Sequence, residues 1–238
     1  MAVMTPEASP SSAIADLDAS TWVVMPLYNE VAVAPHVIKE LKSKFTHVVC
    51  VDDGSTDGSA EAAELAGARV LRHPVNLGQG AALQTGIEYA REQPGACYIV
   101  TFDADGQHRL IDAIALLDLA VDQNLAIVFG SRFLDDRTKV GRAKRAVLKT
   151  AAWVTARTTG LRLTDAHNGL RVMRVDAARQ VNMQQDRMAH ASEIVSQLGR
   201  TGLPWREHPV EVLYTDYSKA KGQSLLNSIN ILIDLIVN

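Results

Sequence analysis

The stretch YIVTFDADGQH, residues 98–108, passes from five residues typical of a buried strand directly into two carboxylates that are one residue apart. Apolar strands of this kind are typical of α/β sheets covered on both faces, and such sheets bind ligands beyond the carboxyl ends of their strands. Asp103, Asp105 and the amide of Gln107 can offer oxygen ligands to one Mg²⁺ or Mn²⁺ ion. The alternative is an ordinary turn, since Asp–Gly pairs close loops and Asp often caps a helix.

The bulk composition favours one large domain. A chain of 238 residues can bury a core of its own, and its formal net charge of -3 gives no global field that would attract nucleic acid. Cys50 and Cys97 fall in predicted strands and are typical of buried core residues in a reducing compartment. Residues 1–20 are rich in Ala, Ser and Pro and lack the apolar stretch of a secretion signal, so we expect a disordered tail on a cytoplasmic protein.

Short apolar runs alternate with helical patterns along the first half of the chain. We expect strands at residues 21–25, 47–51, 68–71, 98–102 and 126–130. Helical periodicity fills the intervals and the loops are short, which predicts an α/β fold with a mostly parallel, doubly wound sheet flanked by helices. The carboxyl ends of parallel strands meet at one edge, so the acidic residues after the second and fourth strands would share that edge.

A second acidic cluster follows the strand at residues 47–51. Asp57 or Ser55 can cap the helix that comes next. Capping does not require Asp52 and Asp53, whose mutual repulsion a donor-rich ligand such as a base or a ribose would offset. Further along, Gly78 permits close backbone approach at a helix N-terminus, where free N–H groups favour anions, although glycine also forms ordinary turns.

The composition changes between residues 137 and 163, where basic residues occur without a single acid. They are Arg137, Lys139, Arg142, Lys144, Arg145, Lys149, Arg157 and Arg162. A solvated helix face is one explanation of such a run. In a chain of net negative charge, an unbalanced basic run favours contact with a phosphate or a lipid headgroup.

The C-terminal part of the chain predicts three further elements. A helix over residues 189–198 carries His190 and Glu193, which we expect on an exposed surface unless they face the cleft. Residues 210–214 predict a late strand, and a small basic loop follows it. The apolar helical stretch 225–238 is too short to span a bilayer. It can lie in a membrane interface, pack on a membrane protein or form a plain core helix.

Six motifs occur in a fixed order: Pro26-Leu-Tyr-Asn-Glu30, Asp52-Asp-Gly-Ser-Thr-Asp57, Asn76-Leu-Gly-Gln-Gly80, Asp103-Ala-Asp-Gly-Gln-His108, Gly130-Ser-Arg132 and Asp165-Ala-His-Asn-Gly-Leu-Arg171. In order and spacing they resemble family 2 inverting glycosyltransferases, closest to the polyprenyl-phosphate (dolichyl-phosphate-like) hexosyltransferase branch. The resemblance implies a GT-A domain over residues 21–224, a UDP- or GDP-linked sugar donor, and Mg²⁺ or Mn²⁺.

The resemblance also implies roles for individual residues. The nucleotide would contact Pro26, Tyr28, Glu30, Asp53, Asp57, Gly78, Asp103 and Ala104, and the metal would contact Asp103, Asp105 and Gln107. The catalytic residues would be Asp105, Asp165 and Arg132, and the acceptor phosphate would meet Arg132, Arg145, Lys149 and Lys219. One departure concerns Lys219, which stands where an arginine is common, because lysine lacks the planar bidentate fork.

A second departure concerns the membrane. Many relatives continue into transmembrane helices, whereas this sequence ends at Asn238. We therefore expect a peripheral protein at the inner face of the cell membrane, with a membrane protein partner available to its C-terminal helix.

The reaction that these expectations favour is a single displacement at the anomeric carbon by a phosphate oxygen of a polyprenyl phosphate. Such an acceptor is already ionised near neutral pH, so no strong general base is required. Transfer to a saccharide hydroxyl is the runner-up, and it requires a carboxylate base, either Asp165 or Glu193. A non-catalytic nucleotide-sugar sensor that regulates a membrane partner is the alternative from another class.

Overall fold

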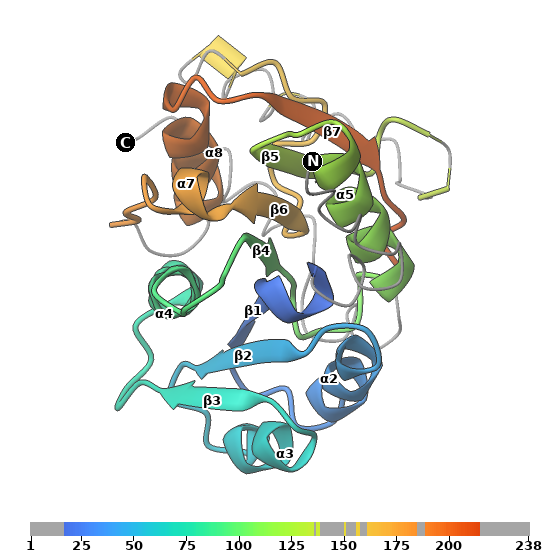
Figure 1. The fold of residues 1–238 in the computed structure, drawn as a ribbon. Coiled ribbons are helices and arrows are strands. Elements are labelled where there is room, and N and C mark those ends of the chain that lie inside the picture. The colour runs from blue at the N-terminus through green and yellow to red at the C-terminus, as the bar shows by residue number, and fades with distance from the viewer. Residues whose placement is uncertain are drawn as a thin grey trace, which may run out of the picture.

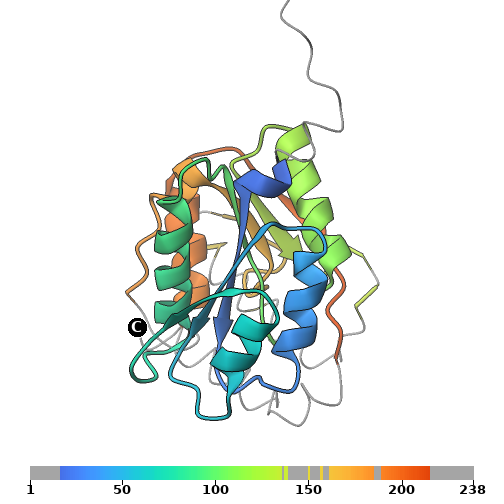
Figure 2. The same ribbon diagram turned by 60° about the horizontal axis from the view of Figure 1, so that its bottom comes forward.

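The computed structural model describes residues 17–135, 137–138, 150, 156–157, 161–184 and 189–214. They form a seven-stranded sheet between two layers of helices (Figures 1 and 2). The strands are β1 (Thr21–Leu27), β2 (His47–Asp52), β3 (Arg69–Arg72), β4 (Tyr98–Thr101), β5 (Ile127–Ser131), β6 (Arg171–Arg174) and β7 (Trp205–Pro209). The helices are α2 (Ala34–Lys42), α3 (Ser59–Leu65), α4 (Gln79–Arg91), α5 (Leu110–Asp122), α7 (Val175–Ala178) and α8 (Ala189–Arg200).

The sheet has the strand order β3-β2-β1-β4-β6-β5-β7. Its strands are parallel except for β6, which is antiparallel to both β4 and β5. The prediction of a mostly parallel sheet is therefore confirmed, and the five predicted strands correspond to β1 through β5. The carboxyl ends of the parallel strands lie along one edge, which we call the carboxyl edge.

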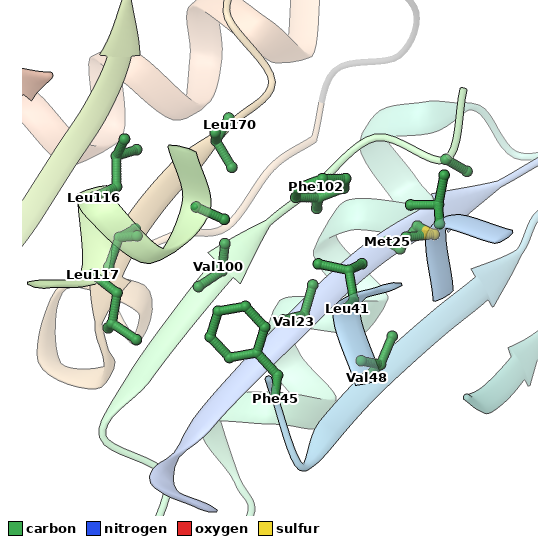
Figure 3. Packing of buried hydrophobic residues seen from close by; sticks show 14 of the residues in the cluster. Val23, Met25, Leu41, Phe45, Val48, Val100, Phe102, Leu116, Leu117 and Leu170 are labelled. Carbon is green, nitrogen blue, oxygen red and sulfur yellow. The ribbon is translucent and has the colours of Figure 1, made fainter. Parts of the chain in front are cut away.

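Two hydrophobic cores lie on the two faces of this sheet. In β1 alternate residues face opposite sides, so Val23 and Met25 join one core while Trp22 and Val24 join the other. Helices α2, α3 and α5 cover the first face, and α4, α7 and α8 cover the second (Figure 2). Figure 3 shows Phe45 and its neighbours in the first core. This packing fixes both faces of the sheet and leaves its edges to the loops.

The structure corrects four details of the sequence interpretation. The last strand is not residues 210–214 but β7, because the N–H groups of Glu211 and Val212 bond to side chains instead of to a neighbouring strand. The antiparallel β6 was not predicted. His190 is buried, not exposed, and Cys97 is exposed, not buried.

Candidate active site

The loop after β1 is fastened to the loop after β2. The N–H of Glu30 donates to Oγ of Ser59 (2.7 Å), and the N–H of Val31 donates to Oδ2 of Asp57 (3.2 Å). Burial raises the pKa of Asp57, but hydrogen bonds from Ser59 and Val31 outweigh it and lower that pKa. Asp57, which the family resemblance assigns to the nucleotide, is thus a carboxylate that joins two loops of the carboxyl edge.

Asp53 organises the loop that precedes α4. Its Oδ1 accepts a hydrogen bond from the N–H of Leu77 (2.9 Å) and lies 2.8 Å from Nδ1 of His73, while its Oδ2 accepts from the N–H of Gly78 (2.8 Å). The other ring nitrogen of His73 lies 3.0 Å from Oγ1 of Thr85 on α4. Because these contacts engage both oxygens of Asp53, this carboxylate shapes the loop that holds Gly78. His73 is a site residue that the sequence argument missed.

Asp52 has a different environment. It is buried, and its Oδ2 accepts a hydrogen bond from the N–H of Ser55 (3.3 Å). Its Oδ1 is buried without a hydrogen-bond partner among the described residues. A buried carboxylate oxygen without a donor is costly, so Asp52 is a candidate acceptor for an N–H or O–H group of a ligand.

The acidic loop, residues 103–108, follows β4. Oδ2 of Asp103 lies 3.0 Å from Nε2 of His108, and its Oδ1 accepts a hydrogen bond from the amide of Gln79 on α4 (3.3 Å). Burial raises the pKa of Asp103, but His108 and other positive charges outweigh it and lower that pKa. Burial and the charge of Asp103 raise the pKa of Asp105 to about 6. The predicted metal ligand Gln107 is buried in the same loop, and its N–H donates to Oδ1 of Asp105 (3.0 Å).

The turn before β6 packs directly against the acidic loop. A Cβ atom added at Gly169 would lie 2.1 Å from Oδ2 of Asp103. The hydroxyl of Thr101, at the end of β4, donates to the carbonyl oxygen of Gly169 (2.6 Å). Only glycine fits at this position without movement of the Asp103 carboxylate, so the turn and the acidic loop form one unit.

Arg171 belongs to a quoted motif, but the sequence argument gave it no role. It is buried at the first position of β6. Burial lowers its pKa to about 10, while the charges of Asp103 and Asp165 act in the opposite direction. This buried guanidinium therefore couples the acidic loop electrostatically to Asp165.

Asp165 and Arg132 form a buried ion pair. Oδ2 of Asp165 accepts hydrogen bonds from Nε of Arg132 (2.5 Å) and from its backbone N–H (3.1 Å). Burial lowers the pKa of Arg132, but Asp165 and Tyr214 together outweigh it and raise that pKa. Glu207 on β7 accepts hydrogen bonds from the N–H and hydroxyl of Thr164 (2.8 and 2.9 Å), which fixes the approach to Asp165. Asp165 therefore orients Arg132.

The other predicted site residues divide into two groups. Pro26, Tyr28, Glu30, Gly78 and Ala104 lie in β1 or in loops of the carboxyl edge. Arg145, Lys149, Lys219 and the segment 225–238 lie outside the described residues, as do residues 1–16 of the predicted tail. Within the part of the chain that the structure describes, no helix is both long enough and apolar enough to cross a membrane.

The chain is similar to glycosyltransferases in sequence. The family model "Glycosyl transferase family 2" matches residues 22–181. An uncharacterised protein of Methanocaldococcus jannaschii is 33% identical over 221 residues, 91% of this chain and 90% of that protein. The UDP-N-acetylglucosamine–dolichyl-phosphate N-acetylglucosaminyltransferase of Methanococcus voltae is 26% identical, with 92% of this chain and 96% of that protein covered. The polyprenol monophosphomannose synthase of Mycolicibacterium smegmatis is 32% identical over 68% of this chain and 64% of that protein.

Solved structures confirm the expected fold class. Glucosyl-3-phosphoglycerate synthase from Mycobacterium tuberculosis, in complex with Mn²⁺, UDP and phosphoglyceric acid, aligns with a TM-score of 0.68 and 18% identity. The alignment covers 98% of this chain and 84% of that structure, so the two share the GT-A fold. Because the family model matches well over half of the sequence, this chain belongs to glycosyltransferase family 2, in agreement with its resemblance to the polyprenyl-phosphate branch.

Proposed function

We propose that this glycosyltransferase transfers a hexose, with inversion, from a nucleoside-diphosphate sugar to a polyprenyl phosphate. The observation that carries the acceptor class is the ion pair between Asp165 and Arg132, whose atoms lie 2.5 Å apart. A hydroxyl acceptor needs a base to take its proton, and Oδ2 of Asp165 is occupied while it holds the guanidinium. A phosphate acceptor brings its own negative charge, which Arg132 can bind.

The second candidate base is also engaged. Both oxygens of Glu193 accept hydrogen bonds from the N–H of Gln184, each at 3.0 Å, and Oε1 also accepts one from the amide of Gln197 (3.1 Å). Glu193 therefore holds the loop before α8 against the helix. Two relatives, the dolichyl-phosphate N-acetylglucosaminyltransferase and the polyprenol monophosphomannose synthase, support the same class of acceptor over a saccharide hydroxyl.

The donor is proposed to lie along the loops after β1, β2 and β4. Tyr28 is exposed there and offers an aromatic surface, and Oδ1 of Asp52 offers a carboxylate oxygen to a base N–H. Asp53 and Asp57 act through the backbone that they hold, as their hydrogen bonds indicate. The other nucleotide contacts implied by the family resemblance are Pro26, Glu30, Gly78, Asp103 and Ala104.

The residues of the acidic loop fit a divalent cation. Asp103 and Asp105 repel each other, as the raised pKa of Asp105 indicates, and a cation between them would relieve that repulsion. No cluster of three His, Cys, Asp or Glu ligands occurs among the described residues. The two carboxylates of Asp103 and Asp105, with the amide of Gln107, suit Mg²⁺ or Mn²⁺, which commonly take one or two carboxylates and complete their shell with substrate phosphates and water. A bound cation would neutralise charge on the departing diphosphate.

The residues of the chain then divide the work of a single displacement. The loops that Asp53 and Asp57 hold would fix the nucleotide, and Arg132, oriented by Asp165, would hold the acceptor phosphate. Attack by a phosphate oxygen on the face opposite the leaving diphosphate inverts the anomeric carbon. Arg171 would hold the acidic loop and the Asp165–Arg132 pair at a fixed spacing, because the carboxylates of Asp103 and Asp165 both attract it.

A substrate panel tests this proposal. The full chain is incubated with labelled UDP- and GDP-sugars, Mg²⁺ or Mn²⁺, and either a polyprenyl phosphate or a soluble saccharide. We expect label on the lipid phosphate, with an anomeric configuration opposite to that of the donor by NMR. Label on the saccharide alone would refute the acceptor class, and donor binding without turnover would indicate a sensor.

A further inference from the structure

The exposed hydrophobic side chains of the described residues are concentrated at the carboxyl edge. The large ones are Tyr28, Val31, Leu65, Val75, Leu77, Ile111, Val121, Leu134 and Leu213. Leu65 and Val121 lie in the last turns of α3 and α5, at the opposite edge of the sheet. The remaining seven lie in loops or in a first helical turn beyond the carboxyl ends of strands. Single exposed aliphatics need no explanation, but seven of nine on one edge indicate a surface with a partner.

These seven residues form two groups. Four lie on the donor half of the edge, in the loops near Asp53 and Asp57. The other three, Ile111, Leu134 and Leu213, come from α5, from the loop after β5 and from the segment after β7, and we call them the docking trio. The sheet order separates the groups, because β1 to β3 lie on one side of β4 and β5 to β7 on the other.

A buried carboxylate links the segments that carry the docking trio. Asp112 accepts hydrogen bonds from Arg137 (3.2 Å) at Oδ1 and from the N–H of Glu211 (3.0 Å) at Oδ2. Arg137 also donates to Asp135 (2.6 Å), beside Leu134. Ile111 and Leu134 are thus chain neighbours of Asp112 and Asp135, and Leu213 lies two positions after Glu211. Figure 1 shows the segment after β7 running beside the first turn of α5.

The docking trio borders the acidic loop. The N–H of Leu213 donates to the carbonyl oxygen of Gln107 (2.9 Å). Two partly exposed arginines lie on the same surface, where Arg109 pairs with Glu211 and Arg137 pairs with Asp112 and Asp135. Thr138 is the last described residue before the segment 139–149, and that segment carries Lys139, Arg142, Lys144, Arg145 and Lys149 without an acid. The surface therefore combines exposed aliphatics with paired arginines, and the basic run follows it in the sequence.

We propose that the docking trio enters the surface of a bilayer that contains anionic lipids. This inference rests on the proposed function, because a polyprenyl phosphate resides in a membrane. Aliphatic side chains would enter the interface, and the basic residues that follow Thr138 in the sequence would add attraction to anionic headgroups. In this orientation the acidic loop and Arg132 face the layer in which the phosphate of a lipid acceptor lies.

Vesicle flotation tests the docking surface with a matched control. The full chain, the variant Ile111→Ser/Leu134→Ser/Leu213→Ser and the control Leu65→Ser/Val121→Ser are each mixed with vesicles of phosphatidylglycerol and phosphatidylcholine. We expect the trio variant to partition about tenfold less than the wild type or lower, because it loses three aliphatic side chains from the interface. The control should float as the wild type does, and vesicles of phosphatidylcholine alone should bind the wild type more weakly. Thermal unfolding checks that both variants fold.

Three outcomes would overturn the docking surface. They are a trio variant that floats like the wild type, a control variant whose vesicle binding falls as much as that of the trio variant, or a wild type that binds neither kind of vesicle. A water-soluble short-chain prenyl phosphate separates this result from the proposed function. The trio variant should use that acceptor at the wild-type rate and lose activity only with a long-chain acceptor in vesicles. If the wild type glycosylates neither acceptor, the proposed function fails, and flotation still decides whether the trio docks.

Discussion

Replacement of Gly169 by alanine tests whether the position of Asp103 controls activity. The added Cβ would lie 2.1 Å from Oδ2 of Asp103, which is 0.9 Å inside the 3.0 Å limit that real contacts respect. The backbone of Gly169 is not in the left-handed region, so alanine brings no conformational strain of its own. The carboxylate of Asp103 must therefore rotate away, and it then loses its 3.0 Å contact with His108.

The structure sets the size of the effect. Overpacking of this kind costs about 1–3 kcal/mol, which lowers Tm by roughly 2–12 °C in a chain of this size. If Asp103 holds the cation, its displacement should lower kcat by about 10–100-fold and raise the Mn²⁺ concentration needed for half-maximal activity, as small shifts around metal ligands do. Steady-state kinetics over a Mn²⁺ titration, together with thermal unfolding, measures both quantities.

The control is Gly95→Ala. Gly95 has a φ of 77° and nothing within 4 Å of the added Cβ, so alanine there costs about 1 kcal/mol of backbone strain far from the acidic loop. It should lower Tm and leave kcat unchanged. If Gly169→Ala keeps the wild-type kcat and the wild-type Mn²⁺ dependence, the assignment of Asp103 is wrong.

Three further predictions follow from individual contacts. Asp105→Asn should abolish transfer yet stabilise the metal-free protein at pH 7 by about 1–3 kcal/mol, because the pKa of Asp105 is raised in the folded state to about 6, so its carboxyl disfavours folding once it ionises. That gain should vanish as the pH falls below 4, and urea unfolding at the two pH values checks it; equal stability of the two proteins at pH 7 would contradict it. His73→Ala should weaken nucleotide affinity by about 1–3 kcal/mol through the loop that Asp53 holds, and calorimetry that shows no change would refute that role. Arg132→Ala should lower acceptor kcat/KM about tenfold or more with little change in donor affinity, and adding Asp165→Asn should restore stability but not activity, since it removes the unpaired buried charge. Recovery of activity in the double variant would mean that Arg132 does not touch the acceptor.

The sequence alone determined the sheet and its edge. Apolar runs separated by helical patterns fix β1, β2, β4 and β5, because a strand buried on both faces needs continuous hydrophobic residues and the helices between such strands need a period near four. The edge strand β3 has only two apolar residues, and its place in the alternation of strands and helices indicates it. The acidic loop could be placed for the same reason, since Asp103 and Asp105 follow such a run at the carboxyl end of a strand. Local pattern is sufficient when each residue's environment is set by its own strand or helix.

Only the tertiary structure decided which polar groups meet. Arg171 stands in a strand that hydrophobic pattern does not reveal, and its electrostatic interaction with both Asp103 and Asp165 depends on the antiparallel pairing of β6. Gly169 packs against Asp103, which lies 66 positions earlier in the chain, and no local sequence signature predicts this approach. The roles of Asp52 and Asp53 also separate only when the loop of Leu77 folds back and donates to Asp53 alone. Hydrogen bonds and ion pairs of this kind are set by distances between segments, and local sequence pattern carries no information about those distances.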